Sequence, residues 1–100
     1  MMGDPVIESD NACSPLLTCT ARAASAIHAR PAARLVRAIQ DFDAELVLIR
    51  DKVRADAKSI LDILALSIQE GDWFEIEARG ADAEAALEAL SGLFTSNFER

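Results

Sequence analysis

The hydrophobic pattern of this chain switches repeatedly between the two-residue period of a strand and the 3.6-residue period of a helix. Strand patterns cover residues 16–21, 44–50, 53–57 and 73–78, whereas helix patterns cover residues 29–42, residues 59–67 and the segment after Asp82. The element order is therefore βαββαβα. This order predicts an α+β fold, an open-faced sandwich in which three helices cover one face of a four-stranded antiparallel sheet.

Polar residues at alternate strand positions predict that the other sheet face is open to solvent, and Trp73 should lie there, opposite Phe74. A hairpin turn is expected at Asp51-Lys52, and Ser59 and Asp82 should cap the two later helices. The outward-facing charged residues are Arg54, Asp56, Glu75, Glu77 and Arg79. The core-facing helix residues are Ala32, Leu35, Val36, Ile39 and Phe42 in the first helix and Ala83, Ala86, Leu87, Leu90 and Phe94 in the last.

The charge of the chain limits its partners. A formal net charge of −7 argues against a nucleic-acid binder and against docking on anionic lipid, because both need a basic surface. Residues 1–15 have no cationic start, and the chain has no apolar run of membrane-spanning length. We therefore expect a cytoplasmic protein without membrane insertion, with a flexible extension at residues 1–15 and one domain at residues 16–100.

Residue counts exclude several chemistries. His28 is the only histidine, and a zinc site built from Cys13, Cys19 and His28 lacks ligand spacing. Reduced thiols are expected, with a disulfide as the less favoured alternative. The sequence contains no G-x-G-x-x-G, P-loop or G-x-S-x-G motif. We therefore expect neither a metal nor a cofactor.

His28 comes directly before a helix pattern, with Pro31 in the first helical turn, where its missing N–H costs nothing. The free backbone N–H groups and the dipole at this helix end form an anion site suited to phosphate. The same positive end disfavours the imidazolium, so a neutral His28 keeps a free nitrogen and can act as a nucleophile. Ser25, Ala29 and Arg30 are the candidate phosphate-binding residues, with Arg30 neutralising the phosphoryl charge.

Arg30, Arg34 and Arg37 form a basic stripe on this helix, which predicts a docking face for an acidic partner in an otherwise acidic chain. From the spacing alone, a second interpretation is equally open. His28 is then a polar residue at a helix end, and the arginines are the solvated face of an amphipathic helix.

Two segments resemble the phosphocarrier protein HPr family of the bacterial phosphotransferase system. The segment "AIHARPAA" is similar to the family's active-site segment, in which a small apolar pair precedes His-x-Arg-Pro-Ala at the start of the first helix. The segment "ADAKSILDIL" is similar to the regulatory segment, in which Lys-Ser precedes an apolar residue at a helix start. Ser59 follows His28 by 31 residues, which matches the family without a gap. The resemblance runs from Leu16 to the C-terminus, and the βαββαβα order is also the family's.

The resemblance implies a carrier that turns nothing over on its own. His28 would accept a phosphoryl group from the phosphohistidine of enzyme I, which phosphoenolpyruvate charges, and pass it to a histidine of an enzyme IIA-type protein. Arg30 matches the arginine that assists transfer. Ser59 matches the serine that a kinase/phosphorylase modifies in some bacteria, and a plain N-cap is the alternative. Small carriers of this type work as monomers.

Residues 59–67 carry more apolar side chains than one buried stripe needs. The resemblance implies that Ile60, Leu61 and Leu64 form the apolar part of the docking face. The alternative is a short helix sunk in the core.

The chain also departs from the family pattern. Ala26 and Ser67 stand where glycine-like residues are usual, and Asp41 and Asp62 add acid around a face that is often basic. Sugar uptake and a nitrogen-related regulatory branch therefore both stay open. The alternative function is a regulatory docking or signalling module of the same fold in which transfer by His28 is secondary. A hydrolase would need a second catalytic group that the sequence does not indicate.

Overall fold

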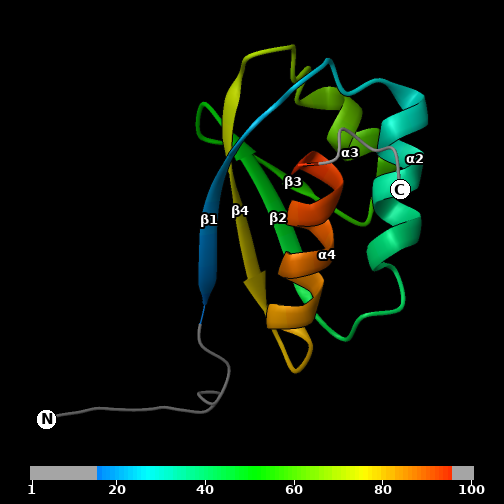
Figure 1. Cartoon of the computed structure of the whole chain (residues 1–100), viewed down its shortest axis with the longest axis vertical. Helices are drawn as coiled ribbons and strands as arrows, with labels where there is room; N and C mark the ends of the chain where they lie inside the picture. The colour runs from blue at the N-terminus through cyan, green and yellow to red at the C-terminus, as the bar shows by residue number, and fades with distance from the viewer. Residues whose placement is uncertain (1–15, 96–100) are drawn as a thin grey trace, which may run out of the picture.

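A computed structural model of the chain describes residues 16–95 and shows one sheet with helices on a single face (Figure 1). The strands are β1 (Leu17–Arg22), β2 (Glu45–Arg50), β3 (Val53–Asp56) and β4 (Trp73–Arg79). They lie in the order β1-β4-β2-β3, and every neighbouring pair is antiparallel. The helices are α2 (Ala29–Ile39), α3 (Ile60–Ala65) and α4 (Ala83–Thr95). The predicted βαββαβα order and the open-faced sandwich are confirmed.

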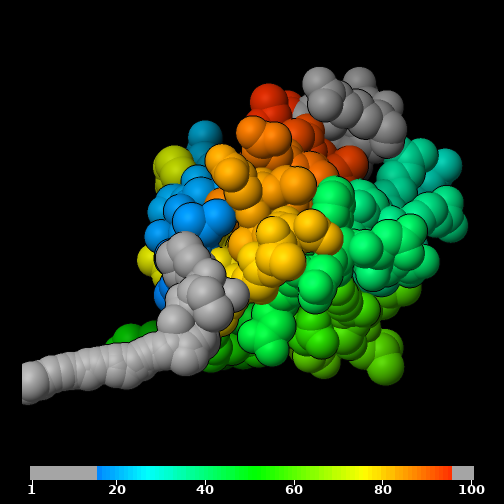
Figure 2. Space-filling view, turned by 90° about the horizontal axis from the view of Figure 1, so that it is seen from below, coloured from blue at the N-terminus to red at the C-terminus, as the bar shows by residue number. Residues whose placement is uncertain are grey.

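The core lies between the inner sheet face and the helices. Strand alternation turns Leu46, Leu48 and Ile76 inward, and these side chains are at most 1% exposed. Helices α2 and α4 cover them, and Figure 2 shows α4, in orange, between β1 on one side and α2 on the other. The Phe74 and Phe94 rings meet edge to face with centroids 4.9 Å apart. Each buried Leu or Ile contributes about 1.5–3 kcal/mol to this packing.

The β2–β3 hairpin turns where the sequence predicts. Asp51 and Lys52 both have positive φ, 52° and 70°, which is the signature of a two-residue type I′ turn. Arg50 and Val53 form the closing pair of the hairpin. Val53 shares the inner face with Ala55, but it is 55% exposed because it lies at the turn, whereas Ala55 is buried.

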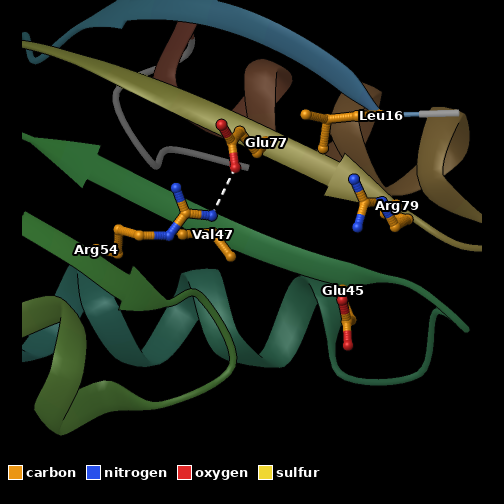
Figure 3. A pocket seen from close by; sticks show the side chains of 6 residues that line it. All are labelled: Leu16, Glu45, Val47, Arg54, Glu77 and Arg79. Atoms are coloured by element: carbon orange, nitrogen blue, oxygen red, sulfur yellow. Dashed lines mark hydrogen bonds and ion pairs between the residues drawn. The ribbon is translucent and has the colours of Figure 1, made fainter. Parts of the chain in front are cut away.

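The outer sheet face carries the charged residues that the alternation predicts. Arg54 on β3 forms an ion pair of 2.6 Å with Glu77 on β4. Figure 3 shows this pair across Val47, in a shallow hollow that Leu16, Glu45 and Arg79 also line. Trp73 is 64% exposed on this face, as expected.

Helix boundaries differ from the prediction in identifiable ways. Helix α2 ends at Ile39 instead of residue 42, because the Phe42 N–H turns back to the Ile39 carbonyl in a tight bend. Phe42 and Leu87 are only half-buried, although both still pack against the core. Leu93, which the sequence did not place in the core, is buried at the end of α4. Ser59 caps α3 as predicted.

Asp82 has a structural contact that the sequence did not indicate. Its carboxylate accepts a hydrogen bond of 2.7 Å from the backbone N–H of Asp43, and its own N–H donates to the Asp43 carbonyl at 2.9 Å. The loop before β2 is thereby tied to the start of α4. Gly80 allows this contact, because it has φ of 127° and a Cβ there would lie 2.9 Å from Ala44 Cα.

Candidate functional site

His28 is the N-cap residue of α2. Its backbone is extended, with φ −99° and ψ −168°, and its carbonyl accepts the first helical hydrogen bond from the Ala32 N–H at 3.0 Å. The imidazole makes no capping hydrogen bond, and the residue is exposed. The ring therefore takes no part in capping the helix and is accessible to a partner.

The helix end next to His28 has the composition of an anion site. Ala29 and Arg30 are the first two helical residues, so their backbone N–H groups have no partner inside the helix. Pro31 follows as the buried third residue and has no N–H to leave unpaired. The first turn contains no acidic residue, and Arg30 is exposed. The start of α2 therefore combines two free amides, the positive end of the dipole and the exposed side chain of Arg30, directly after His28 in the chain.

The loop that leads to His28 is fixed by backbone hydrogen bonds to residues 66–72. The Ala23 N–H donates to the Asp72 carbonyl at 2.9 Å, and the Gly71 N–H donates to the Ala23 carbonyl at 2.7 Å. The Ile27 N–H donates to the Ile68 carbonyl at 3.0 Å. Ser25, a candidate phosphate-binding residue, is half-buried within this loop. This pairing could not be predicted from the sequence, because backbone groups of any residue type can form it.

The arginines of the predicted basic stripe all lie on the exposed part of α2. Arg30, Arg34 and Arg37 are each exposed, and Arg37 also sits in the last turn, where a cation offsets the negative helix end. Arg34 and Arg37 line a shallow hollow with Leu93 of α4. The stripe therefore begins at Arg30, two residues after His28, and runs along the exposed part of the helix, while its role as a docking face stays a prediction.

Helix α3 packs against α2 and exposes apolar side chains. Leu61 is 78% exposed and Ile60 is 38% exposed, whereas Leu64 is half-buried. Within the helix only Ile63 is fully buried. The interpretation of α3 as a helix sunk in the core is therefore wrong, because its surplus apolar residues Ile60 and Leu61 are exposed on a helix that packs against α2.

Ser59 holds the start of α3. Its Oγ accepts a hydrogen bond of 3.3 Å from the Asp62 N–H, and the Asp62 carboxylate accepts one of 3.3 Å from the Asp56 N–H. Lys58, next to it, donates from Nζ to the Phe42 carbonyl at 2.7 Å. Ser59 is half-buried within this network. The serine thus has a structural role as a cap.

The remaining candidates from the sequence lie elsewhere. The Sγ of Cys19, on β1, is 3.8 Å from the Ser91 Oγ, and within residues 16–95 no cluster of His, Cys, Asp and Glu has the arrangement of a metal site. Cys13 and the predicted extension at residues 1–15 lie outside the described residues. The helices in the described part of the chain are too short or too polar to cross a bilayer.

The chain is similar to known proteins over most of its length. The sequence family described as "PTS HPr component phosphorylation site" matches residues 17–96. The phosphocarrier protein HPr of Treponema pallidum (strain Nichols) is 42% identical over 73 residues, which are 73% of this chain and 83% of that protein. The phosphocarrier protein NPr of Escherichia coli (strain K12) is 42% identical over 74 residues, covering 73% of this chain and 82% of that protein. The crystal structure of HPr-C-His from Thermoanaerobacter tengcongensis superposes with a TM-score of 0.75 at 31% identity, over 86% of this chain and 97% of that one.

Proposed function

The chain belongs to the HPr family of phosphotransferase-system phosphocarriers, and from this premise we propose that it carries the phosphoryl group on His28. The observation that supports this assignment most is the position of the ring. An exposed imidazole that makes no cap bond stands at a helix N-terminus with two unpaired amides and Arg30 in the same turn.

These groups account for both directions of transfer. The lone pair of His28 Nδ1 attacks phosphorus on the donor phosphohistidine, the bond from phosphorus to the donor ring nitrogen breaks, and its electron pair returns to that nitrogen. The Ala29 and Arg30 amides and the Arg30 guanidinium stabilise the charge of the phosphoryl oxygens during transfer. The same step in reverse, with a different partner ring, releases the group to an acceptor.

The surface around His28 suits an acidic partner with an apolar contact area. The α2 arginines supply positive charge in a chain of net charge −7, and Ile60 and Leu61 supply the apolar part. We assign enzyme I as the donor and an enzyme IIA-type protein as the acceptor. A phosphate on Ser59 would add negative charge at the edge of this surface and weaken the binding of an acidic donor.

The experiment that tests this function is phosphorylation with phosphoenolpyruvate and a cognate enzyme I. We expect one phosphate per chain that is labile in acid and stable in base, and none on a His28→Ala variant. Equal labelling of wild type and His28→Ala would exclude His28 as the acceptor.

A further inference from the structure

One guanidinium holds the loop that supports the segment before His28. The Arg50 side chain, at the end of β2, donates from Nη1 to the Leu66 carbonyl at 3.2 Å. Its Nε forms an ion pair of 3.0 Å with Asp72 Oδ2. Leu66 and Asp72 stand at the two ends of the loop formed by residues 66–72, so Arg50 spans the loop from end to end.

This loop has a backbone that needs such support. Ser67 and Gly71 both have positive φ, 53° and 86°, and the serine carries a steric penalty there. The Asp72 carboxylate also accepts from the Gln69 N–H at 2.8 Å, so the residue that Arg50 contacts also organises the turn. The Arg50 and Asp72 side chains are 29% and 27% exposed, which limits their freedom to move apart into water.

The loop in turn fixes the residue before the phosphoacceptor. The Ile68 carbonyl accepts from the Ile27 N–H at 3.0 Å, and both side chains are at most 5% exposed. A second pair of backbone bonds joins Ala23 to Gly71 and Asp72. A shift of residues 66–72 therefore moves the backbone on which His28 stands.

We propose that Arg50 is a positioning residue for phosphoryl transfer, which acts through residues 66–72 and Ile27 on the orientation of His28. The proposal rests on the proposed function of His28. In this proposal Arg50 acts only through its protein contacts and is not assigned a contact with the phosphoryl group. Its planar guanidinium holds both ends of the loop in a fixed geometry and also lies 3.8 Å from the exposed Asp51 carboxylate. In-line transfer depends steeply on the alignment of the reacting atoms.

The test compares Arg50→Met with Arg54→Met. Both arginines belong to the β2–β3 hairpin and both form an ion pair, but Arg54 pairs with Glu77 on the outer sheet face. In steady-state transfer from phosphorylated enzyme I, we expect Arg50→Met to lower kcat by about tenfold. Its KM should stay within about twofold of wild type, because the docking residues are unchanged. Arg54→Met should change neither kcat nor KM. Arg50→Lys keeps the positive charge but lacks the planar guanidinium, so its kcat should lie between those of wild type and Arg50→Met.

Amide hydrogen exchange gives a readout that does not depend on transfer. Exchange of the Ile27 amide should be faster in Arg50→Met than in wild type and unaltered in Arg54→Met. A folded Arg50→Met with wild-type kcat, or an equal loss in Arg54→Met, overturns the proposal. If Arg50→Met does not fold, Asp72→Asn decides by the same criteria. If the wild-type protein takes up no phosphate, the proposed function of His28 is refuted. An Ile27 amide exchange rate that is the same in Arg50→Met and wild type would separately refute the role of Arg50.

Discussion

The Oγ of Ser59 accepts a hydrogen bond from the backbone N–H of Asp62, three residues later, at 3.3 Å. This contact satisfies one of the unpaired amides at the start of α3. It also places the hydroxyl beside Ile60 and Leu61, at the edge of the proposed docking surface. The same oxygen is thus a cap in the fold and the candidate site of regulation.

Substitution of Ser59 separates these two roles. Asn and Asp are both good N-caps, so Ser59→Asn and Ser59→Asp should each stay within about 0.5 kcal/mol of wild type in the free energy of unfolding, whereas Ser59→Ala should lose about 1 kcal/mol. Calorimetric titration with enzyme I should show weaker binding for Ser59→Asp alone, because only it adds charge. Equal affinities for the Asn and Asp variants would leave Ser59 as a cap only.

Replacement of Arg30 should affect transfer more than folding. Arg30→Ala removes a guanidinium from the turn that holds His28, and we expect kcat for transfer to fall by about 10- to 100-fold. The circular dichroism spectrum and Tm should stay unchanged, because the side chain is exposed. Arg37→Ala, at the other end of α2, should raise KM with little change in kcat. An unaltered kcat in Arg30→Ala would remove Arg30 from the site.

Substitutions of Leu61 and Ile63, two residues apart on α3, should affect different properties: binding to enzyme I in the first case and stability in the second. Leu61 is 78% exposed, so Leu61→Ser should weaken binding to enzyme I while the free energy of unfolding changes by less than about 0.5 kcal/mol. Ile63 is fully buried, so Ile63→Ala should cost about 2–5 kcal/mol of stability. Urea denaturation and binding titration measure the two effects. Full affinity in Leu61→Ser would contradict the assignment of α3 to the docking surface.

Gly80 should tolerate a side chain less well than Gly71. Both have positive φ, but a Cβ at Gly80 would lie 2.9 Å from the Asp43 carbonyl oxygen, whereas at Gly71 the nearest atom is 3.6 Å away, at the end of the Arg22 side chain. Gly71→Ala should cost about 1 kcal/mol for its conformation alone. Gly80→Ala should lower the free energy of unfolding by more than this, because the backbone at Asp43 and Ala44 must also move. Equal losses of stability for the two variants in urea denaturation would show that the loop at Asp43 shifts without a measurable energetic cost.

The sequence predicts the elements well where local chemistry decides them. The Asp51-Lys52 turn, the Ser59 cap and the outward direction of Trp73 each follow from a few neighbouring residues, and the structure has them all. The position of His28 directly before α2, with Arg30 in the first turn, also follows from the local sequence.

Long-range backbone contacts account for what the sequence misses. The Ile27 N–H finds the Ile68 carbonyl 41 residues away, and neither side chain takes part in this bond. Asp82 has the residue type of a helix cap, yet its carboxylate accepts from Asp43 on another loop. Leu93 is buried at the end of α4, although the helical spacing favoured Leu87.

The direction of β1 bears on how this fold can be combined with other domains. Strand β1 begins at Leu17, at one end of the sheet, and its chain returns as α2 from the opposite end, where His28 lies (Figure 1). A six-residue strand spans about 20 Å, so that length separates the start of β1 from the end of the sheet where His28 lies. An affinity tag or fused domain attached ahead of residue 16 therefore joins the molecule remote from the histidine. Such fusions suit immobilisation and tethering experiments, because they add mass without crowding the imidazole.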